Sequence, residues 1–182
     1  MTVDDVLAYP HQIGDALWRV GAAGIPARSA RVEVCGVAYG ADALAAAIVG
    51  DRARAPAAGE EPLVLCVSYS GDDEEALECF DQAGRRGVPR AVVCTAGAVA
   101  ARARDEGVPV IGIPAGFDDP RAAIVYFTVA AVVSAEPSLA AELEAAIPTL
   151  ERLAAGEPAE AETPAERVLV DLFRRDLESA KP

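Results

Sequence analysis

The stretch from Ser68 to Glu75 carries the residues best suited to chemistry, because an apolar run ends there in hydroxyl groups and a glycine. It begins Ser68-Tyr69-Ser70-Gly71 and continues with four carboxylates. A turn of this kind before a helix offers hydroxyls, backbone amides and the positive helix end to an anion. The acidic residues oppose that role, so the stretch predicts a ligand site with an unusual charge balance.

The elements that position this turn follow a repeating pattern. Short β-rich runs alternate with helix-like segments, which is typical of βαβ units and a parallel sheet. The expected strands are 32–35, 63–67, 91–94 and 108–113, and the expected helices between them are 41–49, 72–86 and 99–106. The second run is apolar throughout, as in a central strand covered on both faces. The predicted fold class is therefore α/β, a three-layer αβα sandwich with a central parallel sheet and flanking helices.

Helices are also expected on either side of this core. Residues 3–20 carry an apolar stripe, and Pro10 should kink or restart that helix. Residues 121–135 indicate an almost wholly buried helix. A further helix is predicted over 139–153, with Ser138 as its N-cap.

The carboxyl-terminal part is set apart by its composition. Residues 154–164 are acidic, contain proline and lack apolar periodicity, so they predict a mobile linker. The chain then divides into a domain over 1–153, the linker, and an amphipathic helix over 165–182. That helix must bury its stripe on its own core or on a second subunit, and we favour the second subunit.

The charge and the chain's start exclude several classes of partner. Acidic residues outnumber basic ones 29 to 16, giving a net charge of −13, which argues against nucleic acid. The longest apolar stretch, 122–135, is too short to span a bilayer. The first residues do not have the pattern of a targeting segment. We expect a cytoplasmic protein without membrane or nucleic-acid partners.

The four cysteines do not have the short paired spacing of metal sites. Three of them, Cys35, Cys66 and Cys94, fall in strand-like runs, and Cys79 lies in a helix-like segment. We therefore expect small core residues rather than a disulfide or a zinc site, in a reducing compartment. No metal and no cofactor is predicted.

Three loops follow predicted strands and qualify as parts of a ligand site, namely 36–40, 68–73 and 114–121. In open α/β sheets, ligands bind beyond the carboxyl ends of the strands, where the strand order reverses. A doubly wound sheet can therefore bring these loops to one pocket.

Two motifs in the right order resemble the sugar isomerase (SIS) domain. They are Ser68-Tyr69-Ser70-Gly71 followed by Glu74-Glu75, and Pro114, Gly116 and Pro120-Arg121-Ala122-Ala123 before Tyr126. Within that group the chain is most similar to the amino-terminal half of bifunctional phosphoglucose/phosphomannose isomerases, over about residues 5–150. The resemblance implies a SIS-type, flavodoxin-like fold and a phosphorylated sugar as ligand.

The resemblance also implies roles for individual residues. Ser68 and Ser70 would bind phosphate or hydroxyl groups, Gly71 would allow close backbone approach, and Arg121 would contact the sugar phosphate. The other ligand-binding candidates are Gly36, Tyr39, Gly40 and Asp73. Catalysis would fall to Glu75 and Arg121. An alternative is that the serines only cap the next helix and that Arg121 pairs with Asp118 or Asp119.

The chain departs from the family pattern in three places. Asp72 and Asp73 stand where the family motif usually has Asn and Thr, so a hydroxyl donor has become an anion. Tyr39 lies in a loop that is glycine-rich in the family. The second family half, with its catalytic glutamate and histidine, has no counterpart here, and the resemblance gives the single histidine, His11, no role.

Three interpretations follow for the function. The first is a SIS-domain protein that binds a sugar phosphate or a similar small polar metabolite without the full catalytic machinery. The second is an active small aldose–ketose phosphosugar isomerase whose pocket a second subunit completes. The third is a structural partner of a separate carboxyl-terminal isomerase half. The first two predict a homodimer or a higher homo-oligomer, with 121–135 or the last helix at the seam.

Overall fold

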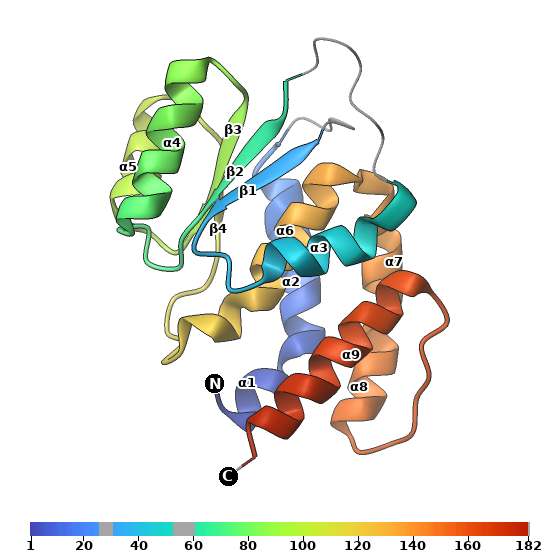
Figure 1. Cartoon of the computed structure of the whole chain (residues 1–182). Helices are drawn as coiled ribbons and strands as arrows, with labels where there is room; N and C mark the ends of the chain where they lie inside the picture. Colours follow the sequence, from blue (N-terminus) through green and yellow to red (C-terminus); the bar gives the residue numbers. More distant parts are fainter. Residues whose placement is uncertain (26–30, 53–60, 182) are drawn as a thin grey trace.

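A parallel sheet of four strands forms the centre of the computed structural model, which describes residues 1–25, 31–52 and 61–181 (Figure 1). The strand order is β1-β2-β3-β4. The strands are β1 Val32–Gly36, β2 Leu63–Val67, β3 Arg90–Cys94 and β4 Val110–Gly112. The four expected strands are thus confirmed, although β4 is shorter than the apolar run that contains it.

Helices cover both faces of this sheet. On one face lie α3 (Ala41–Val49) and α6 (Ile124–Ala135), and on the other lie α4 (Glu74–Arg86) and α5 (Gly97–Asp105). Along β2, Leu63, Leu65 and Val67 join the first core, whereas Val64 and Cys66 join the second. Because neighbouring strand residues point to opposite faces, the apolar run fills two cores at once. The predicted α/β sandwich is confirmed.

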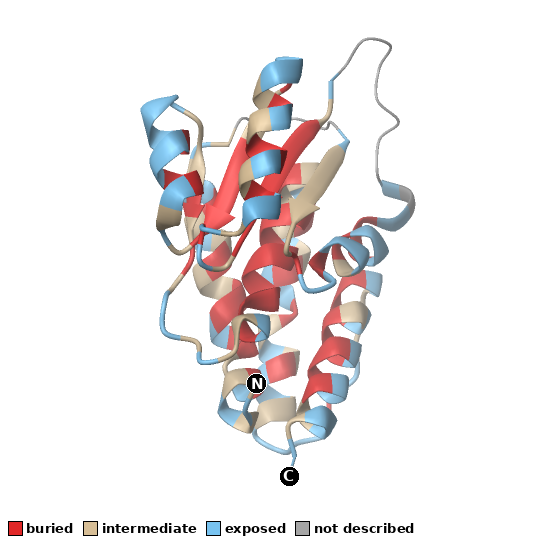
Figure 2. Cartoon of the chain, turned by 60° about the vertical axis from the view of Figure 1, so that its left-hand side comes forward, coloured by how far each residue is buried: buried red, intermediate tan, exposed pale blue. Residues whose placement is uncertain are grey.

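The first helical region is divided as the sequence predicts. Helix α1 (Val3–Leu7) ends before α2 (Tyr9–Ala22), which has Pro10 in its first turn. A proline is tolerated there because the first amides of a helix have no intrahelical partner. Helix α6 follows a 3₁₀ turn, η2 (Pro120–Ala123), and almost all of α6 is buried. Figure 2 shows the buried residues where the sheet and helices face one another.

The helix predicted over 139–153 is interrupted. The structure has a 3₁₀ turn η3 (Pro137–Leu139), then α7 (Ala140–Ala145) and α8 (Ile147–Ala154). Pro148 lies in the first turn of α8, and its missing N–H prevents one continuous helix. Ser138 is not the cap, since Glu136 accepts the Ser138 N–H at 3.2 Å.

The last helix, α9 (Pro164–Ser179), packs on the chain's own core. It begins with a capping box between Thr163 and Glu166. Its buried stripe includes Leu169 and Phe173, and it contacts α1, α3, α7 and α8 (Figure 1). The prediction that a second subunit covers this stripe is therefore wrong.

The acidic segment before α9 has contacts with the flanking helices. Arg152 donates to the carbonyl of Pro158 at 2.6 Å, and Arg174 donates to that of Ala159 at 3.2 Å. The division of the chain at 154–164 stays a prediction. Across the described ranges, no helix is both long and apolar enough to cross a membrane.

The sequence predicted four separate core cysteines without a disulfide, and the structure contradicts this prediction for two of them. Cys35 and Cys66 are register partners on β1 and β2, and Cys79 of α4 lies against both strands. Cys35 and Cys79 form a disulfide, with their Cα atoms 6.1 Å apart. The partners are 44 residues apart in sequence, so only the strand register and the packing of α4 bring them together.

Candidate ligand site at the carboxyl ends of the strands

The loops after β1, β2 and β4 bring the predicted site residues to one edge of the sheet. The strand order of the described sheet does not reverse there, contrary to expectation. Instead, α3 leaves β1 on one face while α4 leaves β2 on the other, so the two loops diverge from adjacent strands. Divergence of this kind is what opens the carboxyl edge of a doubly wound sheet to ligands.

Hydrogen bonds join the three loops. The Val37 N–H donates to the carbonyl of Val67, the residue before the serine turn, at 2.9 Å, and the Phe117 N–H donates to the Tyr69 hydroxyl at 2.8 Å. Partial burial raises the pKa of the Tyr39 phenol, and the carboxylates of Asp73 and Asp119 raise it further, while Arg121 lowers it. The hydroxyl of Tyr39 therefore remains a hydrogen-bond donor at neutral pH.

The serine turn is occupied by its own carboxylate. Ser68 is buried, and its Oγ accepts the Gly71 N–H at 2.7 Å while it donates to Oδ2 of Asp73. Ser70 accepts the Asp72 N–H at 3.1 Å and lies 3.5 Å from the same Asp73 oxygen. The two hydroxyls that the resemblance assigns to a ligand thus both face the Asp73 carboxylate.

The neighbouring carboxylate of Asp72 has a different partner. Its Oδ1 accepts the Ala98 N–H in the first turn of α5, at 2.8 Å. Asp73 makes no side-chain cap at the start of α4, although it is the residue at that position. Asp72 therefore stabilises the start of α5, and neither acid caps α4 through its side chain.

Glycine is required where the turn meets the start of α5. Gly71 has φ +84°, and a Cβ there would lie 1.8 Å from the carbonyl oxygen of Ala96. The Gly71 carbonyl accepts the Val99 N–H at 2.9 Å. The close approach that the sequence assigns to Gly71 is therefore toward another loop of the same chain.

The first loop holds Tyr39 in an uncommon conformation. With φ 52°, it is the one non-glycine residue of the described chain in the left-handed region. Its ring stacks on Phe127 of α6 with centroids 6.2 Å apart, and 36% of its surface stays exposed. Such strain costs roughly 1–3 kcal/mol and concentrates at functional sites. Gly36 and Gly40 flank this loop with φ +103° and +89°.

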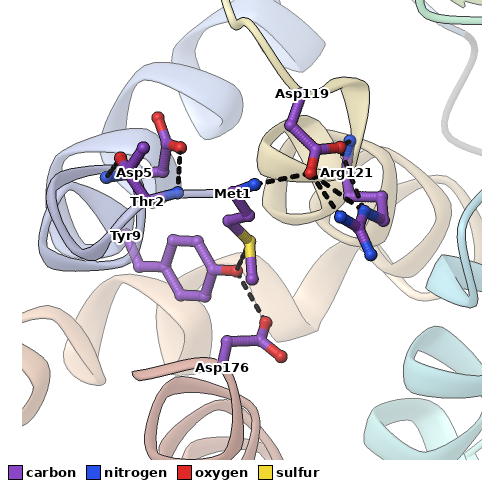
Figure 3. A network of polar contacts seen from close by, with 7 residues as sticks. All are labelled: Met1, Thr2, Asp5, Tyr9, Asp119, Arg121 and Asp176. Carbon is purple, nitrogen blue, oxygen red and sulfur yellow. Dashed lines mark hydrogen bonds and ion pairs between the residues drawn. The ribbon is translucent and has the colours of Figure 1, made fainter. Parts of the chain in front are cut away.

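Arg121 pairs with Asp119, as the alternative interpretation expected. The Asp119 carboxylate accepts the Arg121 backbone N–H at 3.0 Å and its Nη2 at 2.6 Å (Figure 3). The α-amino group of Met1 also donates to it, at 2.5 Å. The guanidinium and the amino group hold the pKa of Asp119 well below its ordinary value. Because 66% of the Arg121 side chain is exposed, it can still face a ligand.

The remaining candidates lie outside this cluster. Glu75 is exposed in the first turn of α4, and the described contacts include none between it and the serine hydroxyls. His11 is exposed on α2. Among the described residues, no group of three His, Cys, Asp or Glu side chains could hold a metal ion.

The sequence did not single out Tyr69 and Phe117, which join two loops of the site. The Phe117 N–H donates to the Tyr69 hydroxyl at 2.8 Å, and their rings lie 6.1 Å apart. The one available signal was an aromatic residue placed between two serines that both face the turn.

A second polar network connects the loop 114–121 to α2 and α9 through Met1. The Tyr9 hydroxyl donates to Oδ2 of Asp176 in α9 at 2.7 Å and contacts Sδ of Met1 at 3.4 Å (Figure 3). Burial and the Asp176 carboxylate raise the pKa of Tyr9, so it remains a donor.

We expect Tyr9→Phe to lower the free energy of unfolding by about 1–3 kcal/mol, because a buried carboxylate oxygen loses its donor while the ring packing stays. Urea denaturation measures the loss. Tyr69→Phe is the matched control, since its hydroxyl belongs to a partly exposed site, and it should cost less. Equal losses in the two variants would contradict the prediction.

Comparisons with known proteins bear on this arrangement. No protein-family model matches the chain. Over 70 residues the chain is 36% identical to a bifunctional phosphoglucose/phosphomannose isomerase of Aquifex aeolicus strain VF5. This match covers 38% of the present chain and 22% of that protein. The structure of the present chain is similar to the crystal structure of tagatose-6-phosphate ketose/aldose isomerase from Escherichia coli, with a TM-score of 0.58 and 13% identity.

The structural match covers 84% of this chain and 52% of the Escherichia coli chain. The chain thus spans less than a quarter of its curated relative and about half of the solved structure. The similarity to these two phosphosugar isomerases and the shared fold support a sugar isomerase (SIS) domain in this chain.

Proposed function

We propose that this chain binds a sugar phosphate, or a similar small polar metabolite, at the loops 36–40, 68–73 and 114–121, without the full machinery for isomerisation. The observation that carries the proposal is the Asp73 carboxylate on the hydroxyls of Ser68 and Ser70. The turn already holds an anion of its own, so its donors are arranged for negatively charged oxygen. A ligand phosphate must displace that carboxylate, which makes binding weak.

The other side chains of the site suit a sugar. Tyr39 offers a hydroxyl donor and a ring fixed by Phe127, and Arg121 offers a planar fork of donors that matches phosphate oxygens. Arg121 is already oriented by Asp119, so little side-chain freedom is lost when it binds.

The proposal of weak or absent catalysis follows from the same geometry. Aldose–ketose isomerisation needs a base that moves a proton between adjacent carbons and a group that opens the ring. Glu75 is exposed, and Arg121 remains protonated at all ordinary pH. Arg121 is already paired with Asp119, and the described contacts of the site include none between Glu75 and a second acid or base.

Isothermal titration with fructose 6-phosphate, glucose 6-phosphate and mannose 6-phosphate tests this proposal. We expect saturable binding of at least one of them, with fructose, glucose and mannose themselves as controls that bind more weakly. A coupled assay for conversion among the three phosphates should show no turnover. Rapid turnover would overturn the proposal, as would the absence of binding to every phosphate.

An active isomerase with a pocket shared between subunits is the second candidate, and the exposed position of Glu75 is compatible with it. The exposed Glu75 would then complete the pocket of a neighbouring subunit. In that case Glu75→Gln would abolish turnover, whereas Glu74→Gln, with the same charge change beside it, would not. The third interpretation, a structural partner of a separate isomerase half, has less support, because the apolar stripe of α9 packs on its own chain.

We propose that the chain forms a homo-oligomer through the surface around Trp18, and not through residues 121–135 or the last helix. Helix α6 is almost wholly buried and the apolar stripe of α9 lies in the core, so neither offers a free apolar face. Trp18 is 69% exposed instead, beside a cavity of about 530 Å³ between α2, α6 and α7. Light scattering after size exclusion measures the mass, and the fluorescence of this single tryptophan reports whether its surroundings change on dilution.

A further inference from the structure

Three of the four cysteines meet between the sheet and α4. Cys35 and Cys66 lie opposite each other on β1 and β2, and the disulfide joins Cys35 to Cys79. The Sγ atom of Cys66 lies 3.5 Å from that of Cys79, the shared neighbour. Cys94 belongs to the same apolar layer and is a free thiol. The arrangement gives one sulfur two possible partners.

We propose that Cys35, Cys66 and Cys79 form a thiol–disulfide exchange site, in which Cys79 is the common sulfur and a small thiol of the glutathione class sets the oxidation state. The exposure of the strands indicates that Cys35 is the sulfur that a small thiol attacks. Every residue of β1 is partly exposed, whereas Cys66 and Cys79 are buried. A soluble thiol therefore reaches the disulfide from the Cys35 side.

Reduction at this site balances with two small thiols. The thiolate of the first attacks Sγ of Cys35, a mixed disulfide forms there, and the bond to Cys79 breaks so that Cys79 leaves and takes up a proton. A second thiol attacks the sulfur of the small molecule and releases Cys35, which is also protonated. One disulfide of the small thiol is produced, and the protein gains two electrons and two protons. Oxidation by that small disulfide is the reverse.

Internal exchange needs no other reactant. The Cys66 thiolate attacks Sγ of Cys79, so the Cys66–Cys79 bond forms as the Cys35–Cys79 bond breaks, and the proton of Cys66 passes to Cys35. Burial raises the pKa of the Cys66 thiol to about 12, so little thiolate is present at neutral pH. The exchange is therefore slow at pH 7 and accelerates as pH rises.

The position of the disulfide gives it a structural effect. Cys35 directly precedes Gly36 and the first ligand loop, and Cys79 lies in the helix that follows the serine turn. The bond thus ties together the elements that carry two loops of the site. Its loss should lower the melting temperature by roughly 5–15 °C, since the closed loop constrains the unfolded chain.

Peptide mapping of the full chain tests the proposal without any sugar ligand. The protein is equilibrated with glutathione and glutathione disulfide at several ratios, then alkylated under denaturing conditions and digested without reduction. We expect linked Cys35 and Cys79 peptides with Cys66 and Cys94 alkylated at the oxidising end, and four alkylated cysteines at the reducing end. Cys35→Ser should yield linked Cys66 and Cys79 peptides, and Cys79→Ser no linked peptide.

Cys94→Ser is the matched control, because Cys94 is as deeply buried as Cys66. This variant should give the same linked peptides as the parent chain. Four alkylated cysteines at every ratio would overturn the proposal, and so would a linked Cys94 peptide. If Cys35→Ser does not fold, the parent chain is incubated at pH 9 and mapped. The absence of a Cys66–Cys79 peptide in that sample would overturn the shared role of Cys79.

Discussion

Asp73→Asn should raise the affinity for a sugar phosphate about 10- to 100-fold. The carboxylate lies on the hydroxyls of Ser68 and Ser70, where the phosphate is proposed to bind. Two like charges a few ångströms apart at a partly exposed site repel by a few kcal/mol, and each 1.4 kcal/mol is about tenfold in affinity. The amide keeps the size of the side chain, removes the charge and adds a donor. Isothermal titration with the best-bound phosphate measures the gain.

Asp72→Asn is the control for this prediction, because it removes the same charge from the adjacent residue. The Asp72 carboxylate bonds to the Ala98 N–H of α5 and contributes no oxygen to the serine hydroxyls. We therefore expect its affinity gain to stay below about threefold. Equal gains in the two variants would indicate a general charge effect. An unchanged affinity in Asp73→Asn would refute the assignment of this turn as the phosphate site.

Local pattern was sufficient to predict the central sheet and most of its helices. The run Leu63–Val67 is apolar on both faces, and that alone identifies a buried central strand. Helix α4 ends at Arg86, and Gly87 caps it with a φ of +69°, a conformation that glycine adopts without steric cost. Each of these features depends on residues within about one or two turns of the chain.

Long-range packing was beyond the same kind of reasoning. The stripe of α9 could have been covered by either chain, because an amphipathic helix does not specify what it packs on. The bond from Tyr9 to Asp176 spans 167 residues, and the Cys35–Cys79 pair depends on strand register. Neither is visible until the sheet and its helices are assembled.

The site shows the same division between local and distant information. The sequence located the serine turn and the three loops, because each follows a strand. It did not show that Asp72 and Asp73 bond to different elements. That outcome depends on how closely α5 approaches the turn, and so on Gly97, where a Cβ would lie 2.5 Å from the Gly71 carbonyl carbon.

Gly71→Ala should cost at least about 3 kcal/mol of folding free energy, because two penalties add at this position. A side chain in the left-handed region costs about 1–2 kcal/mol by itself. The added Cβ would also lie 1.8 Å from the carbonyl oxygen of Ala96 and 2.8 Å from its carbon, so backbone must move. That movement would strain the bonds that Gly71 makes with Ser68 and Val99.

Gly87→Ala separates the two penalties. Gly87 has φ +69°, and a Cβ there meets no atom within 4 Å, so this variant carries the conformational cost alone. Urea denaturation should give a loss of about 1 kcal/mol for Gly87→Ala and a clearly larger one for Gly71→Ala. If Gly71→Ala is insoluble while Gly87→Ala folds, the stability loss at Gly71 is larger still, and the prediction holds. Equal losses would mean that the close approach of Gly71 to Ala96 does not constrain the turn.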